Sequence, residues 1–282
     1  MPLRFTLPTH IVSNPAQYAA VFGRHQANRR ARAAATQSGG FDFPTQLVGT
    51  TPDGNTTVYY DPSLGTPGAT LAQQILARMP NTYNSSQAFF AIPGQPVNVI
   101  IAAVNNVTDG NGGAYHYGCS FNPGGDLYCD AAFGNPDLTN GLVVAELTES
   151  FMGAQNKGWN CGGSNGEALS RLLAEQLSGG AQGALSAYAT GPTWDQDGRP
   201  NWIDATEDTD QSQDSTGCGV VYMYWMMSRG FTAAQITQAA CPDGTLASNY
   251  TALVGAGANA WSDFSAAVAA LPNGVTSDNP WG

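Results

Sequence analysis

The sequence predicts an α+β fold, in which an N-terminal mixed β-sheet with helices is followed by a helical C-terminal half. Short runs rich in β-branched residues, bounded by Gly, Pro, Asn and Asp, recur up to residue 131. From residue 141 onward, apolar residues recur at helical spacing instead. The chain has 282 residues, of which 42% are hydrophobic, so it is long enough to form one large core.

The first 140 residues are expected to contain the sheet. A helix is predicted over residues 14–37, where Pro15 suits a first helical turn and alanine is frequent. The clearest strand covers residues 97–104, whose β-branched run indicates burial on both faces. The other elements predicted here are strands at 46–49 and 56–61, a helix at 70–79, and strands at 113–119 and 126–131 around a turn.

The remainder of the chain is expected to be mainly helical. Two connections, residues 157–164 and 189–214, are long enough to be functional loops. We divide the chain into a helical extension, residues 1–40, and a single domain, residues 41–282, with a sheet part at 41–140 and a helical part at 141–272. The helices are predicted over residues 141–155, 165–177, 216–228, 232–240, 245–254 and 259–271.

Composition argues against two classes of partner. The net charge is −11 and Lys157 is the only lysine, so the clustered cations that bind nucleic acid are not expected. No apolar run approaches the roughly 18 residues needed to cross a bilayer. Charged residues are scarce while Gly and Pro are plentiful, which is typical of secreted bacterial proteins. We therefore expect a secreted or extracytoplasmic protein. Because residues 1–4 lack an apolar signal core, either its signal peptide was removed or its export uses another route.

Five cysteines suggest disulfides. Cys119 and Cys129 flank a turn signal, so they could face each other across a hairpin. Cys218 and Cys241 precede and follow one predicted helix and could form a second pair, or Cys161 could replace either of them. No C-x-x-C spacing occurs, which argues against a metal site built from cysteines.

A set of glutamates in the first two helices of the helical half forms the candidate site. Glu146 and Glu149 lie three positions apart, so they share one face of an apolar helix and are expected to be buried together. Glu167 begins the next helix. Burying like charges is costly unless a proton, a cation or hydrogen-bond donors compensate, so one carboxyl could act as an acid while another stays ionised. The structural alternative is that one carboxylate reaches solvent and the other caps a helix or pairs with Arg171 or Lys157.

This order of strands, a helix with Glu-x-x-Glu and a second helix beginning Asn-Gly-Glu resembles the zincin metallopeptidases, in particular the plant and bacterial basic secretory protein family. The resemblance covers about residues 97–229 and implies a zincin-like fold with a peptidase-like cleft. The His-Glu-x-x-His motif of that fold would place Ala145 and Glu149 at the histidines, Glu146 at the catalytic glutamate and Glu167 at the downstream acidic position. Because both histidines are replaced, and three carboxylates favour calcium, magnesium or manganese over zinc, we expect a cleft without the usual zinc site and without a cofactor.

Other side chains near this cleft are expected to assist. His116 lies in a predicted strand near the site and could be a proton shuttle, a ligand or an oxyanion donor, with a simple sheet-edge hydrogen bond as the alternative. Aromatic side chains in the surrounding loops often stack on sugars or clamp peptides, although core packing is the alternative for each. The residues assigned to substrate contact are Tyr115, Tyr117, Trp159, Trp194, Asp208 and Asp210.

An acidic loop precedes the helix predicted at residue 216. It carries five carboxylates within residues 204–214, and close-set oxygen donors suit calcium, although the loop lacks the glycine and terminal glutamate of an EF-hand. A solvated loop, a helix cap and a lining of the cleft are the alternatives. The possible calcium ligands are Asp204, Asp208, Asp210 and Asp214.

These features together predict a hydrolase that acts on an extracellular polymer, either a peptide or a polysaccharide. Glu146 would be the general acid or base, Glu149 and Glu167 its partners, and His116 an assisting group. One alternative is a glycoside hydrolase that uses the carboxylate pair. The other is a non-catalytic relative that binds a glycan or a protein through its aromatic loops.

Overall fold

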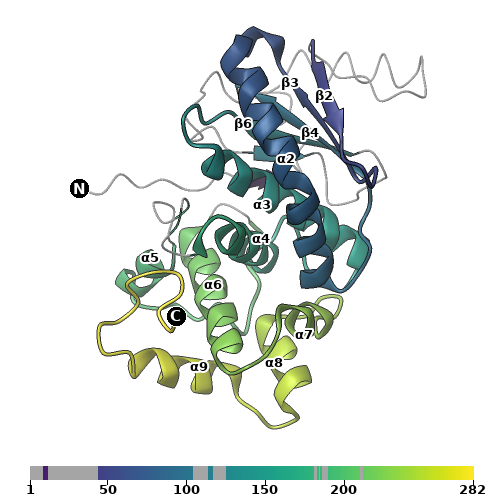
Figure 1. Cartoon of the computed structure of the whole chain (residues 1–282). Coiled ribbons are helices and arrows are strands. Elements are labelled where there is room, and N and C mark those ends of the chain that lie inside the picture. The colour runs from purple at the N-terminus through teal and green to yellow at the C-terminus, as the bar shows by residue number, and fades with distance from the viewer. Residues whose placement is uncertain are drawn as a thin grey trace.

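The structure, a computed structural model of the chain, has the predicted α+β class (Figure 1). It describes residues 9–11, 44–103, 114–116, 125–180, 183, 185, 190–209 and 212–282. Figure 1 shows the sheet and helix α2 in one half of the molecule, helices α6 to α9 in the other, and α3 and α4 between them.

Within these residues, six strands form one mixed sheet in the order β1-β5-β6-β4-β3-β2. Strands β3, β4 and β6 are mutually parallel, whereas β2 runs antiparallel to β3 and β5 antiparallel to β6. The β5–β6 pair is the predicted pairing around the turn. The strands are Thr9–Ile11 (β1), Gln46–Thr50 (β2), Thr56–Tyr60 (β3), Val97–Ala102 (β4), Ala114–His116 (β5) and Gly125–Asp130 (β6).

Strand β4 lies at the centre of the sheet and is buried on both faces, as its β-branched run predicts. Val99 and Ile101 belong to the hydrophobic core that the sheet shares with the helices. Ile100 points to the opposite face and is fully buried as well.

Helix α2 (Gly65–Phe90) connects the parallel strands β3 and β4 and packs against β3. A 3-10 turn, η1 (Pro62–Leu64), leads into it. The sequence predicted only residues 70–79 as helical, because a proline such as Pro80 usually ends a helix. The helix continues through Pro80 because its last turns bury Tyr83 and Phe90 against Phe151.

The helical half contains all six predicted helices, with bounds that differ by a few residues, and one further short helix, α5. Helix α3 packs against α4, and α4 packs against α6. None of the helices in the described ranges is both long enough and apolar enough to cross a bilayer. The helices are Pro136–Gln155 (α3), Ser164–Leu177 (α4), Gly191–Gln196 (α5), Gln213–Ser228 (α6), Ala233–Gln238 (α7), Leu246–Val254 (α8) and Ala260–Ala269 (α9).

The N-terminal segment differs in part from the predicted helical extension. Residues 12–43, which include the predicted helix at 14–37, lie outside the described residues. Thr9–Ile11 form β1, which pairs in parallel with β5. At least these three residues therefore belong to the sheet.

The predicted cysteine pairs are wrong. Cys129 and Cys218 are buried free thiols and Cys241 is an exposed free thiol, so neither the pair Cys119–Cys129 nor the pair Cys218–Cys241 forms. Cys161 is disulfide-bonded. Spacing around a turn or a helix could not determine the pairing, because a disulfide depends on distances that only the fold sets.

The first turn of α4 packs closely against the backbone of Asn160, and Gly166 in that turn provides a test of this contact. A Cβ at Gly166 would overlap the backbone carbonyl of Asn160, whereas a Cβ at Gly162 would make only an ordinary contact at 3.8 Å. Alanine in a helix is normally favoured over glycine by about 1 kcal/mol. Despite this preference for alanine, we expect Gly166→Ala to lower the free energy of unfolding by about 1–3 kcal/mol or more, because backbone rather than a flexible side chain must move.

Urea denaturation of Gly166→Ala, with Gly162→Ala as the matched control, measures this difference. The control should stay within about 0.5 kcal/mol of the wild type. Equal stability of the two variants would contradict the close approach at Gly166.

Candidate functional site

Helix α3 holds Glu146 and Glu149 inside the core. The helix begins with Pro136 after Asn135, whose side chain caps the first turn. Every residue from 138 to 152 is buried, so this part of the helix has no solvent face. Glu146 and Glu149 are both 0% exposed. Neither carboxylate reaches solvent, so that part of the structural alternative is excluded.

Helix α4 brings Glu167 to the same region of the molecule, because α3 and α4 pack directly against each other. Glu167 lies in the first turn of α4, where the helix dipole favours a negative charge, and its exposure is 2%. Ser164 fixes this helix start to the acidic loop: its backbone N–H donates to the Glu207 carbonyl, and its hydroxyl accepts from the Glu207 N–H, both at 3.0 Å.

Glu146 lies close enough to strand β6 to act on it electrostatically. Burial raises the pKa of the Cys129 thiol well above its ordinary value, and the negative charges of Glu146 and Asp130 raise that pKa further. Cys129 and Asp130 are the last two residues of β6, and both are fully buried. Glu146 thus shares an acidic, water-poor environment with the end of a central strand.

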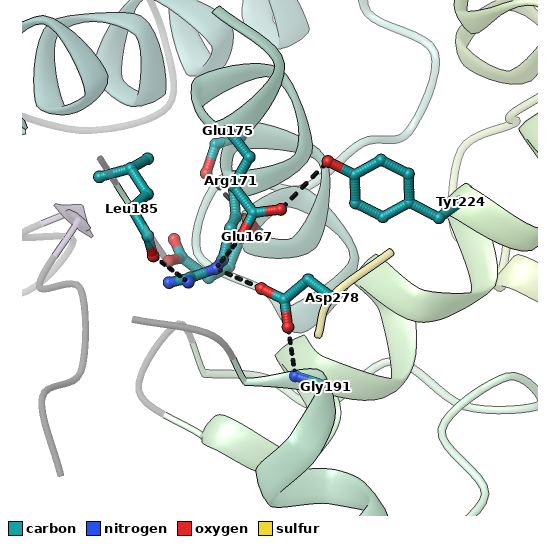
Figure 2. A network of polar contacts seen from close by, with 8 residues as sticks. Glu167, Arg171, Glu175, Leu185, Gly191, Tyr224 and Asp278 are labelled. Atoms are coloured by element: carbon teal, nitrogen blue, oxygen red, sulfur yellow. Dashed lines mark hydrogen bonds and ion pairs between the residues drawn. The ribbon is translucent and has the colours of Figure 1, made fainter. Parts of the chain in front are cut away.

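One turn further along α4, on the same face as Glu167, Arg171 is the centre of a polar network (Figure 2). Its Nε donates to two carboxylates at once: to Asp278 Oδ2 at 3.1 Å and to Glu175 Oε1 at 3.3 Å. Nη2 donates to the Leu185 carbonyl at 3.4 Å. The second oxygen of Asp278 accepts from the Gly191 N–H at 2.5 Å, so the network also holds the start of α5.

Glu175 is a perturbed carboxyl in this network. Burial raises the pKa of Glu175 well above its ordinary value of 4.5, and the negative charge of Asp278 raises it further, although Arg171 opposes both effects. Tyr224 donates to Glu175 Oε2 at 3.1 Å. Burial, followed by the Glu175 charge, raises the pKa of Tyr224 in turn, so its hydroxyl stays a donor.

Among the described residues, more acidic than basic side chains are buried. Six acids are buried but only one base, Arg171. Burying a carboxylate is costly unless a cation, a proton or hydrogen-bond donors compensate it, and Arg171 supplies that compensation to Glu175 and Asp278. The buried acids are Asp130, Glu146, Glu149, Glu167, Glu175 and Asp278.

The tryptophans assigned to substrate contact lie in the core instead. Trp194 is fully buried, stacks on Phe264 and donates its indole N–H to the Pro200 carbonyl at 2.9 Å. Trp159 is buried too, and donates to the Thr237 carbonyl at 3.0 Å. Each indole has a structural hydrogen-bond partner and lacks the exposed face that binding a polymer requires.

Other predicted residues lie partly outside the described part of the chain. Tyr117 and Asp210 are not described, and of Tyr115 and His116 only the backbone in β5 is described. Strand β5 packs against α3, so the strand that bears His116 borders the helix that bears Glu146.

The acidic loop is only partly consistent with the predicted calcium ligands. Asp204 is exposed and accepts from Asn201 Nδ2 at 2.7 Å, and Asp214 lies half-buried in the first turn of α6. Asp208 is exposed and lines a hollow of about 350 Å³ together with Asn165 and Asp243. Across the ranges that the structure describes, no three His, Cys, Asp or Glu side chains are grouped so as to hold a metal ion.

Sequence reasoning missed two members of the buried network. Glu175 could have been found, because Glu167, Arg171 and Glu175 follow one another at intervals of four and must share a helical face. Asp278 gave no such signal, since it lies 107 positions after Arg171 in the C-terminal segment.

No protein family and no curated protein matches the chain.

The raised pKa of Glu175 has a consequence for stability. Because the pKa of Glu175 is raised in the folded protein, the folded state keeps a proton that the unfolded chain releases above about pH 4.5. The stabilisation is therefore complete at low pH and is lost as the pH rises toward the raised pKa. Glutamine mimics the protonated form and cannot ionise.

We expect the Glu175→Gln variant to gain stability relative to the wild type as the pH rises above about 4.5, by at most about 1.4 kcal/mol for each pH unit. Thermal unfolding of both proteins across this range measures the gain. A difference in Tm that is the same at every pH would contradict a protonated Glu175.

Proposed function

We propose that the protein is a secreted, zincin-like hydrolase that acts on an extracellular polymer and uses buried carboxyl groups in place of a zinc site. The observation that carries this proposal is the burial of Glu146, Glu149 and Glu167, at most 2% exposed, on two helices packed against each other. Such groups destabilise a fold unless they are compensated, and proteins often accept that cost at functional sites.

The proposed chemistry is general acid and base catalysis. Neighbouring carboxyls in a water-poor environment differ in pKa, so that one holds a proton at neutral pH while another stays ionised. Glu146 would be the acid or base that acts on substrate, because it lies on the α3 face near β6 and because β5, which bears His116, packs against the same helix. Glu149 and Glu167 would set the charge around Glu146.

The alternative of a glycan-binding protein without catalysis has less support. It places the binding surface on the aromatic loops, to which Trp159 and Trp194 were assigned. Both indoles lie in the core. The glycoside hydrolase alternative shares the carboxylates of the leading proposal, and the substrate screen below separates the two.

The test replaces one carboxyl at a time by the isosteric amide. Glu146→Gln is expected to lower hydrolysis of the substrate by about 100- to 10,000-fold, as removal of a general acid or base does. The melting temperature should be unchanged or higher, because one of several buried like charges is removed. Casein and a panel of polysaccharides serve as substrates, and the product released identifies the bond class.

Asp137→Asn is the matched control, because Asp137 lies on the same helix but is 59% exposed and pairs with Arg78 on the surface. It should leave turnover unchanged and stability within about 1 kcal/mol. Full turnover by Glu146→Gln would reject the catalytic assignment. A large drop in Tm for Glu146→Gln and Glu149→Gln, with turnover retained at low temperature, would indicate a structural role for both.

A further inference from the structure

The carboxylate of Asp278 is bound inside the protein by donors from two different helices (Figure 2). Its Oδ2 accepts from Arg171 Nε at 3.1 Å, and its Oδ1 accepts from the Gly191 N–H at 2.5 Å. Asp278 is 0% exposed and Arg171 is 1% exposed. A guanidinium and a backbone N–H that each hold one oxygen of a buried carboxylate form an anion-binding site, and Asp278 occupies that site.

The two donors are held in place by contacts other than those with Asp278. Arg171 Nε also donates to Glu175 Oε1, at 3.3 Å, on the same helix. Gly191 packs so closely that a Cβ there would lie 2.6 Å from Val221 Cγ2 and 2.9 Å from Asp278 Oδ1. The site therefore has a defined shape, and only a glycine at position 191 lets a carboxylate approach this N–H.

The segment that supplies Asp278, residues 272–282, contains no helix or strand, and we call it the strap. Its hydrogen bonds to helices of the described chain are the two of Asp278 and a longer one, from the Val275 N–H to Asp195 Oδ2 at 3.5 Å. Val275 is also buried, and Trp281 packs against the core. A segment held at so few points can detach without unfolding the helices beneath it.

We propose that Arg171 and the Gly191 N–H form a carboxylate-binding site, and that the strap is held to the helical half by filling this site with Asp278. When the strap lifts, a small carboxylate from another molecule takes the place of the Asp278 side chain. The strap is thus a displaceable ligand that the chain carries itself. The proposal goes beyond the hydrolase assignment and does not rest on it, because neither Glu146 nor a substrate enters it.

Removing the Asp278 carboxylate while keeping both donors tests the site. Asp278→Ala retains the Cβ and loses only the carboxylate, so formate has the size of the missing group. We expect the variant to have a lower Tm than the wild type. Formate at ten times its dissociation constant should raise the Tm of the variant by about 2–4 °C. Chloride at the same ionic strength should not, because a single atom cannot reproduce the two oxygens.

Asp278→Asn is the matched control at the same position, because its amide fills the space and leaves no room for formate. Asp137→Ala is the surface control, since it removes a 59% exposed carboxylate from its ion pair with Arg78. Neither Tm should rise in formate. An equal gain from formate and chloride in Asp278→Ala, or an equal formate gain in Asp278→Asn, would overturn the site. If Asp278→Ala does not fold, equal refolding yields in formate and in chloride overturn it.

Hydrogen exchange in the full-length wild type tests the strap. The Gly191 N–H donates to Asp278, whereas the Trp194 N–H of the same helix donates to the Thr190 carbonyl at 3.0 Å. Lifting of the strap frees only the first, so its protection factor should be lower than that of Trp194 by about tenfold or more. Formate should restore protection at Gly191 in Asp278→Ala. Equal protection of the two amides in the wild type would show that the strap does not lift separately and would overturn its role.

Discussion

The interior of the described structure depends on how one buried cation is shared among an excess of buried acids. Arg171 contacts Glu175 and Asp278 directly and acts on Glu167 through its charge. Tyr224 and Gly191 supply donors to the oxygens of Glu175 and Asp278 that Arg171 does not reach. Removing one partner from this network lowers the stability of the fold, because another charge is left uncompensated in the protein interior.

This network also joins the parts of the helical half. Arg171 and Glu175 come from α4, Tyr224 from α6, and Asp278 ties the C-terminal segment to the start of α5. Helix α4 in turn packs against α3, whose buried face reaches the sheet near Cys129. The packed pair of α3 and α4 therefore carries acidic side chains both near β6 and around Arg171.

Much of the fold could be predicted because local patterns and tertiary packing agree. The β-branched run of β4 and the apolar helices α3 and α6 each match their burial, and even the antiparallel pairing of β5 with β6 follows from a turn signal. The site was harder to predict. Burial of Glu146 follows from helical spacing, but the positions of Trp159 and Asp278 depend on contacts far apart in sequence, which no local pattern encodes.

The 107 positions that separate Arg171 from Asp278 matter for biosynthesis. A nascent chain emerges from the ribosome at about 5–20 residues each second, so α4 is made on the order of 5–20 s before its distant carboxylate partner exists. Until then the guanidinium has Glu175, on its own helix, as an ion-pair partner but lacks Asp278. The complete network around Arg171 can accordingly form only after the C-terminal segment has been made.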